Sequence, residues 1–153
     1  MLALQDIGTD ILDVDFTLDY VIQTMESRKR NICSILMDQK LFAGLGNYIK
    51  NDALYLAHIS PYQKSNKLTK FQYSKLWNSI RWIAFSNVST WFKEYNLTCP
   101  AHILKRAPKK LLVPYEFFVY DRTEDSLGNE IVFLKSCGGR RTYYVPTIQY
   151  ITE

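Results

Sequence analysis

The chain has 153 residues, enough for one domain or two small subdomains, and its 47% hydrophobic and 22% charged residues are typical of a globular protein. It contains no run of about 18 apolar residues and no basic N-terminal segment, so neither a transmembrane helix nor a signal peptide is expected. The net charge of +4 is compatible with a polyanionic partner but does not require one.

The charges and the cysteines are unevenly placed. Residues 1–19 hold five aspartates and no lysine or arginine, whereas residues 104–112 hold four basic groups. Taken alone, a basic cluster of this size is more typical of a solvated loop than of a binding site. The three cysteines are Cys33, Cys99 and Cys137. Their number is odd, they lie far apart in the sequence and no signal peptide is expected, so they predict reduced thiols in an intracellular protein.

Three helices are predicted in the first part of the chain. Thr17 is suited to cap the first helix, whose apolar residues recur on one face, and Asn31 is suited to open a second, short one. A third is predicted from about Tyr48 to His58, and Pro61 follows because the residue before a proline is displaced from the α region. The apolar face of the first helix comprises Leu18, Val21, Ile22 and Met25.

The fourth helix has the clearest pattern. Thr69 and Gln72 have the spacing of a capping box, with Leu68 ahead of it, and the apolar period continues to about Tyr95. We expect the tryptophan and phenylalanine of this stripe to lie in the core rather than to stack on bases. The stripe comprises Leu76, Ile80, Ile83, Ala84, Val88, Trp91 and Phe92.

The final third is predicted to be β structure, separated from the helices by a basic, proline-bearing loop. Segments 116–122, 130–136 and 141–150 alternate or cluster aromatic and β-branched residues. Turn signals occupy 126–130 (SLGNE) and 137–141 (CGGRR). The predicted fold class is therefore mainly α with a small β part, a helical bundle followed by an antiparallel β-hairpin.

A glycine corner, Gly44-Leu45-Gly46-Asn47, connects the second and third helices. Two glycines flanking one residue permit a sharp turn with positive φ, and Asn47 stands where the third helix begins. The first amides of a helix lack internal partners and carry the positive end of the dipole, so they attract phosphate, and an asparagine adds a side-chain donor. Taken alone, a simple capped connection between two helices is the stronger interpretation of so short a motif.

The residues around the corner resemble the helix–two-turn–helix segment of the Fpg/Nei family of DNA glycosylase/AP lyases. An Asp-Gln pair at 38–39 closes an apolar helix, the Gly-x-Gly-Asn corner follows at 44–47, and an acidic residue, an apolar helix and a proline-containing exit at 59–61 come next. The acidic residue is Asp52, where the family usually has glutamate. The match is long and keeps its spacing, which makes it specific.

The C-terminal segment resembles the finger of the same family. FFVYDR at 117–122, LGNEI at 127–131 and GRRTYYVPTIQ at 139–149 correspond to its strands and its Gly-Arg loop. The resemblance assigns the finger arginine to Arg140, with Arg141 adjacent. It implies that Arg140 contacts a phosphate beside the damaged nucleotide and assists the second elimination step. Taken alone, Arg140 is a turn residue after two glycines.

Zinc-fingered members of the family use four cysteines, and alignment places other residues there. One carboxylate does not make a zinc site, so the resemblance implies a zincless finger, as in some endonuclease VIII-like members, with no metal and no cofactor. Such a hairpin depends on apolar contacts, because an isolated two-stranded hairpin is marginal. The four aligned positions are Glu124, Leu127, Val145 and Ile148. The residues predicted to hold the finger together are Phe117, Val119, Ile131, Phe133, Tyr144 and Val145.

The resemblance covers nearly all of this chain but only the C-terminal half of a family member. It implies an interdomain linker at 1–15, a helix–two-turn–helix domain at 16–98, a basic linker loop at 99–115 and the zincless finger at 116–153. The family's N-terminal proline nucleophile and its glutamate neighbour have no counterpart at Met1-Leu2-Ala3. We therefore expect the catalytic domain to be absent from this chain, with a separate polypeptide as one source of it.

The resulting hypothesis is an endonuclease VIII-like protein of base excision repair that binds duplex DNA with a damaged base or an abasic site. Gly46, Asn47 and Arg140 are predicted to bind DNA, and Lys40 and Lys50 are weaker candidates, being more typical of solvated lysines. A glycosylase/AP lyase and a non-catalytic DNA-binding module remain alternatives, because lyase chemistry needs an amine of lowered pKa. RNA binding is a third, since a ribosomal protein also contains this helical element, and the Arg140 finger argues against it.

Overall fold

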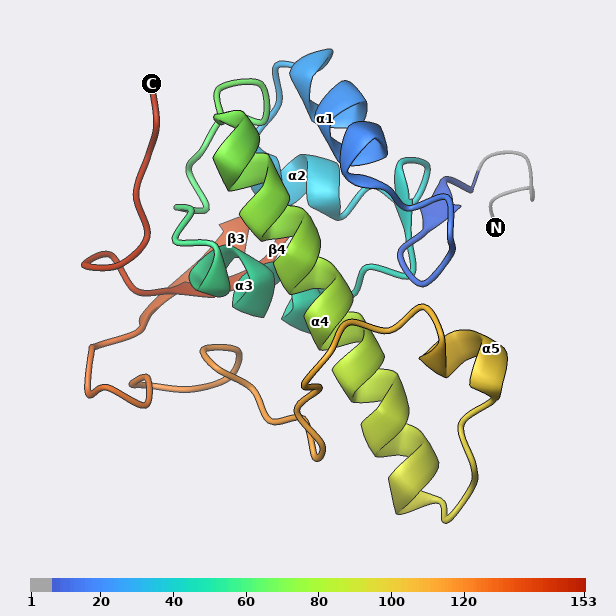
Figure 1. The fold of residues 1–153 in the computed structure, drawn as a ribbon. Coiled ribbons are helices and arrows are strands. Elements are labelled where there is room, and N and C mark those ends of the chain that lie inside the picture. Colours follow the sequence, from blue (N-terminus) through green and yellow to red (C-terminus); the bar gives the residue numbers. More distant parts are fainter. Residues whose placement is uncertain (1–6) are drawn as a thin grey trace.

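The computed structural model describes residues 7–153, so the first part of the predicted linker lies outside the described residues. Helix α4 (Lys70–Glu94) crosses the molecule, and α1 (Leu18–Glu26) and α3 (Asn47–Leu56) pack against it (Figure 1). The fold is mainly helical with a small antiparallel hairpin, as predicted. The other elements are α2 (Ile32–Leu36), α5 (Ala101–Leu104), β1 (Thr9–Asp10), β2 (Phe42–Ala43), β3 (Val132–Cys137) and β4 (Arg140–Tyr144).

The starts of α1, α2 and α4 are fixed by local side chains at the predicted positions. Thr17 and Asn31 accept hydrogen bonds from the first amides of α1 and α2. Thr69 and Gln72 form the predicted capping box of α4. Caps of this kind contribute about 1 kcal/mol each, so these helix boundaries follow from short-range sequence alone.

The main core lies between α4 and the preceding helices. The C-terminal end of α4 extends beyond the other helices (Figure 1), and Trp91 there is 49% exposed. Its predicted place in the core is therefore wrong. The residues that α4 contributes to the core are Tyr73, Leu76, Ile80, Ile83 and Ala84.

None of the helices within residues 7–153 has the length and apolar character needed to cross a membrane.

The β structure is smaller than predicted. Strands β3 and β4 pair antiparallel, with Val132 opposite Tyr144, around a turn formed by two glycines of positive φ. Segment 116–122 is irregular, so the strand predicted there is wrong. The parallel pair of β1 with β2 and the short helix α5 within the basic loop were not predicted, because elements of two to four residues leave no periodic pattern.

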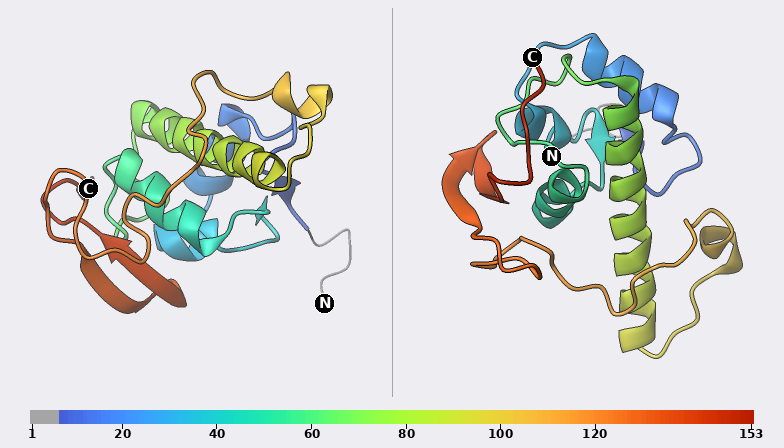
Figure 2. Two further views of the ribbon diagram at one scale, coloured as in Figure 1. Left: turned by 90° about the horizontal axis from the view of Figure 1, so that it is seen from below. Right: turned by 60° about the vertical axis from the view of Figure 1, so that its left-hand side comes forward.

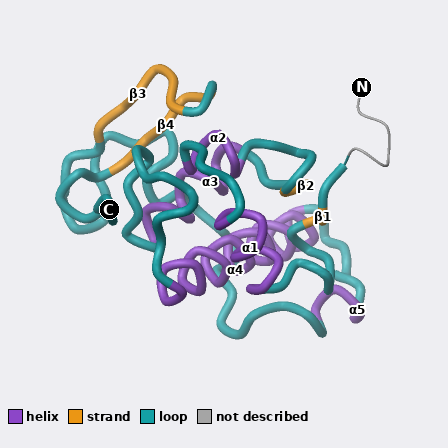
Figure 3. Tube along the Cα trace, turned by 90° about the horizontal axis from the view of Figure 1, so that it is seen from above, coloured by secondary structure: helices purple, strands orange, loops and turns teal. Residues whose placement is uncertain are grey.

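The finger packs on α3 through a second apolar cluster. Phe117 and Phe133, predicted to be buried in it, are 40% and 51% exposed, so these two assignments are wrong. Tyr143 is buried in place of its neighbour Tyr144, because successive side chains of a strand point to opposite faces. The hairpin lies at one end of the molecule, beside α2 and α3 (Figures 2 and 3). The cluster comprises Tyr55, Val119, Ile131, Tyr143 and Val145.

Asp52 of α3 joins the helical part to the finger. Its fully buried carboxylate accepts hydrogen bonds from the amides of residues 118–120 at 2.9, 3.0 and 3.1 Å, and from the hydroxyl of Tyr115. Burial raises the pKa of Asp52, and these donors oppose the rise. Segment 116–122 therefore curves around a carboxylate instead of extending into a sheet.

Asp52→Ala is expected to lower the free energy of unfolding by about 3–5 kcal/mol, because it leaves several buried donors without an acceptor. Urea denaturation followed by tryptophan fluorescence measures the change. The control is Glu94→Ala, which removes an exposed carboxylate from the last turn of α4 and is expected to change the same quantity by less than about 0.5 kcal/mol. Equal effects from the two variants would contradict the role of Asp52.

Candidate nucleic-acid interface

The glycine corner is held by two hydrogen bonds with the side chain of the exposed residue Gln39. Its Oε1 accepts a hydrogen bond from the amide of Gly44 at 3.1 Å, and its Nε2 donates to the carbonyl of Leu45 at 3.3 Å. Gly44 has the predicted positive φ, 81°, but Gly46 has φ −81°, so the sequence expectation fails for this second glycine. Gly46 instead leaves room for an aromatic ring, since a Cβ built on it would lie 3.2 Å from Cε1 of Tyr48.

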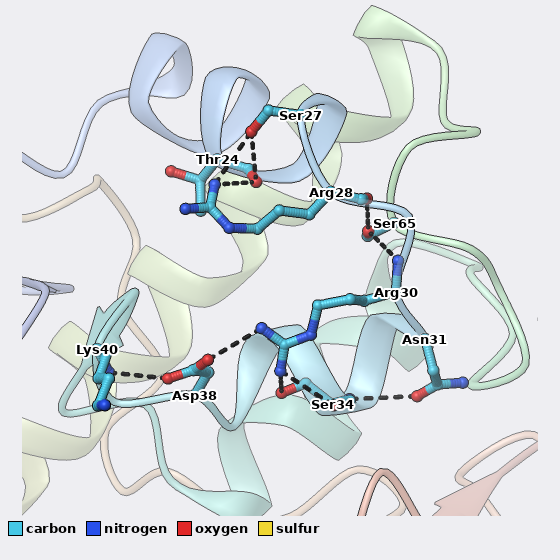
Figure 4. Close-up of polar contacts among 9 residues, drawn as sticks. All are labelled: Thr24, Ser27, Arg28, Arg30, Asn31, Ser34, Asp38, Lys40 and Ser65. Atoms are coloured by element: carbon cyan, nitrogen blue, oxygen red, sulfur yellow. Dashed lines mark hydrogen bonds and ion pairs between the residues drawn. The ribbon is translucent and has the colours of Figure 1, made fainter.

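Asp38 fixes the loop that leads into the corner. Its carboxylate accepts hydrogen bonds from Nη1 of Arg30 at 2.9 Å and from the amide of Lys40 at 3.0 Å (Figure 4). Arg30 also donates to Ser34, so one guanidinium ties α2 to the loop. Burial tends to raise the pKa of Asp38, but the bonds from Arg30 and the Lys40 amide outweigh it and lower the pKa. The Asp-Gln pair therefore has a structural role: Asp38 holds the loop and Gln39 holds the corner.

Helix α3 begins without a side-chain cap. Its N-cap is Gly46, whereas Thr17, Asn31 and Thr69 cap α1, α2 and α4 with side-chain oxygens. No side chain of the N-cap residue therefore competes with an anion for the first amides of α3, where the positive end of the helix dipole lies. Lys40 is exposed on the loop before this corner.

Asn47, the first residue of α3, directs its side chain to the finger. It is only 6% exposed, and its Nδ2 donates to the carbonyl of Arg141 at 2.9 Å. Its Oδ1 is buried and has no hydrogen-bond partner among residues 7–153. The side-chain donor that the sequence assigns to a phosphate is thus engaged with the hairpin in this structure.

Two further polar residues of α3 bind the same strand. Lys50 is fully buried, and its Nζ donates to Oγ1 of Thr142 at 2.8 Å. Oδ1 of Asn51 accepts the amide of Tyr143 at 2.6 Å. The expectation of a solvated Lys50 is therefore wrong, because its ammonium is buried against β4. Burial lowers the pKa of Lys50, and the positive charge of Arg140 adds to the effect.

Arg140 and Arg141 are both exposed at the start of β4. Because Asn47 binds the Arg141 carbonyl, the structure brings Gly46, Asn47 and Arg140 into one region at the start of α3. Lys40 lies outside this set of contacts. The sequence hypothesis missed Asn51 and Tyr55, and it named Asp52 only as part of the family pattern; the structure shows that all three hold the finger. The available signal was the recurrence of polar residues at spacings of three and four along a helix.

The turn at 126–130 is organised by Asp125. Oδ1 of Asp125 accepts the amides of Leu127 and Asn129, and its Oδ2 accepts the hydroxyl of Tyr55 at 2.9 Å. Burial and Asp125 raise the pKa of Tyr55 to about 12, so Tyr55 remains a donor. The polar contacts of Asp125 thus connect this turn to α3.

Between residues 7 and 153 no cluster of three or more His, Cys, Asp or Glu side chains is placed to hold a metal ion.

Comparisons with known proteins agree with this architecture, which is that of a helix–two-turn–helix protein with a C-terminal finger. The model of the formamidopyrimidine-DNA glycosylase H2TH domain matches residues 7–90. The chain therefore belongs to the Fpg/Nei family, named for formamidopyrimidine-DNA glycosylase.

Individual relatives align over nearly the whole chain. Formamidopyrimidine-DNA glycosylases of Arabidopsis thaliana and of a Drosophila simulans Wolbachia are 30% and 29% identical over 95% and 94% of this chain, which spans 34% and 52% of them. The structure superposes on MutM (Fpg) of Thermus thermophilus with TM-score 0.75 and 24% identity, over 95% of this chain and 55% of that one. A complex of Lactococcus lactis Fpg with abasic-site DNA gives 0.73 and 26%, over 95% and 52%. Nothing in these comparisons supports a separate chain that carries the catalytic domain.

Asn51→Ala is expected to increase amide hydrogen exchange of residues 141–144, because Tyr143 loses its acceptor and one donor to the Arg141 carbonyl is removed. Exchange measured by mass spectrometry or NMR tests this. Asn78→Ala, an exposed change on α4, is the control. Unchanged protection of β4 in Asn51→Ala would show that α3 does not hold the hairpin.

Proposed function

We propose that this chain binds duplex DNA at a damaged base or an abasic site and acts in base excision repair, in the compartment that holds the genome. Family membership and the structural similarity to Fpg bound to abasic-site DNA support this. One observation carries it: the uncapped start of α3 lies beside the exposed Arg140 segment, and the bond from Asn47 to the Arg141 carbonyl fixes their relative position.

In the proposed complex the amides that follow Gly46 bind one phosphate and Arg140 binds a second. An anion at a helix start gains from unpaired amides and from the dipole, and a guanidinium binds phosphate through parallel N–H donors. Lys40 adds an exposed positive charge near the corner. For the side chains of Asn47 and Lys50 we propose an indirect role, because both hold the hairpin that carries Arg140.

Gly46→Asp is expected to weaken binding to a duplex containing an abasic-site analogue about 5- to 100-fold, which is a loss of about 1–3 kcal/mol, because its carboxylate would cap α3 and repel the phosphate. Fluorescence anisotropy at several salt concentrations measures the affinity. Gly46→Ala is the matched control: it introduces the same Cβ beside Tyr48 without the charge.

A second pair of variants tests the proposed phosphate contact of Arg140. Arg140→Ala is expected to reduce affinity by a similar factor and to make the salt dependence shallower by about one phosphate contact. Lys93→Ala removes one exposed charge from the last turn of α4 and is expected to have little effect. If Gly46→Asp bound like Gly46→Ala and Arg140→Ala bound like Lys93→Ala, the proposed interface would be wrong.

The alternative is that these residues also carry glycosylase/AP lyase chemistry of an endonuclease VIII-like type, in which Arg140 assists elimination. The glycosylase chemistry is supported by the similarity to formamidopyrimidine-DNA glycosylases. The endonuclease VIII-like type is proposed from the resemblance, which aligns no cysteine of this chain with the four zinc ligands and so favours a zincless finger. Lyase chemistry needs an accessible unprotonated amine. Lys50 has the lowered pKa but is buried, and Lys40 is exposed. The non-catalytic DNA-binding role is the one that the observed geometry supports directly, through the uncapped start of α3 and the exposed Arg140.

Borohydride trapping on abasic-site duplex is expected to give no covalent adduct with this chain at a protein concentration that saturates binding. The measurement is a denaturing gel, with binding confirmed on the same sample. An adduct that is lost in Lys40→Met or Lys50→Met would establish the lyase alternative instead.

A further inference from the structure

A pair of thiols lies where the finger hairpin meets α2. Cys33 of α2 is fully buried, and Cys137, the last residue of β3, is partly exposed. Each sulfur lies 3.5 Å from the same acceptor, the carbonyl oxygen of Pro61. The two sulfurs are therefore no farther apart than the sum of these two distances, although their residues are remote in the sequence.

The hairpin turn is pressed against α2 at this point. Gly138 follows Cys137, and a Cβ built on Gly138 would lie 2.5 Å from the amide nitrogen of Ser34 and 2.8 Å from Cβ of Cys33. Only a glycine permits so close an approach. The two thiols are thus held together by the main chain of the turn.

Their surroundings make the two thiols unequal. The hydrogen bond with Cys33 lowers the pKa of Cys137 to about 6; its burial opposes this, and the positive charge of Lys50 adds to it. The same hydrogen bond, together with burial, raises the pKa of Cys33. Since the thiolate is the nucleophilic form, Cys137 combines reactivity with solvent access, and Cys33 is a protonated thiol directly behind it.

We propose that Cys33 and Cys137 form a reactive dithiol that hydrogen peroxide converts into a disulfide, which links the finger hairpin covalently to α2. The Cys137 thiolate attacks one peroxide oxygen; an S–O bond forms, the O–O bond breaks, and the leaving hydroxide takes a proton to become water. The Cys33 sulfur then attacks the Cys137 sulfur of the sulfenic acid. The S–S bond forms, the S–O bond breaks, and the leaving hydroxide takes the Cys33 proton as a second water. One peroxide is reduced and two thiols are oxidised.

The disulfide would fix the hairpin next to Arg140, the proposed phosphate contact. Any effect of oxidation on DNA affinity therefore rests on the proposed function, whereas the dithiol chemistry does not. The third thiol, Cys99, follows α4 and has a pKa raised by burial. It is replaced by serine in the test below, so that only Cys33 and Cys137 can be oxidised as thiols.

The test uses the full chain with Cys99→Ser, treated with one equivalent of hydrogen peroxide and analysed as intact protein by mass spectrometry. The expected product is lighter by two hydrogen atoms, yields a Cys33–Cys137 linked peptide and is reversed by dithiothreitol. With Cys33→Ala, oxidation is expected to stop at a Cys137 sulfenic acid that dimedone traps. With Cys137→Ser, Cys33 is expected to remain a thiol. An unlinked product from the parent protein, or oxidation of Cys33 without Cys137, would overturn the proposal.

Two neighbouring glycines provide a matched pair that tests the geometry. Gly138 and Gly139 both have positive φ, 66° and 86°, so an alanine strains the main chain at either position. Only at position 138 does the new Cβ meet α2, since nothing lies within 4 Å of it at 139. Gly138→Ala is expected to slow disulfide formation about tenfold or more relative to Gly139→Ala, because moving the turn away from α2 separates the two sulfurs and a disulfide has strict geometric requirements. Equal rates in two folded variants would contradict the proposed site.

Discussion

The carbonyl oxygen of Arg141 is the point at which the helical part of the molecule holds the finger. Nδ2 of Asn47 donates to it at 2.9 Å, and Nζ of Lys50 and Nδ2 of Asn51 approach it at 3.4 Å. A carbonyl offers two lone pairs, so the short bond from Asn47 carries most of the attraction and the longer contacts add little. The position of β4 is therefore set by the first residue of α3 and reinforced by the next turn of the same helix.

Helix α3 buries charge that is compensated largely by the finger. Lys50 and Asp52 are both fully buried, and the donors and acceptors that satisfy them come from β4, from residues 118–120 and from Tyr115. A buried ion without partners costs several kcal/mol, so α3 in its present position requires the finger to be in place. The converse also holds, because a hairpin of two short strands is marginal by itself. The two parts are thus expected to unfold together.

The helices could be predicted from the sequence because their determinants are local. Thr17, Asn31 and Thr69 each act within three residues, and the apolar period of α4 continues through its buried length. The predictions that failed concern residues whose environment is set by contacts distant in the sequence. Segment 116–122 has the composition of a strand, but a carboxylate more than sixty residues earlier takes its amides. A lysine is expected at the surface from its residue type, but Lys50 is buried against a partner, Thr142, that lies about ninety positions away in the sequence. Sequence pattern carries no direct information on contacts at such separations.

The same limit applies to the site. The family resemblance selected Gly46, Asn47 and Arg140 as DNA-binding residues, which stays a prediction. The structure brings the three residues together, but the Asn47 side chain is bonded to the hairpin. In this orientation Oδ1 of Asn47 is buried without a partner in the described part of the chain, and a buried unpaired acceptor costs about 1–3 kcal/mol. An uncompensated acceptor of this kind, at the uncapped start of a helix, does not serve stability. It is explained if the role of Asn47 is to set the separation between the first amides of α3 and Arg140 on β4, the two groups that we propose bind phosphates.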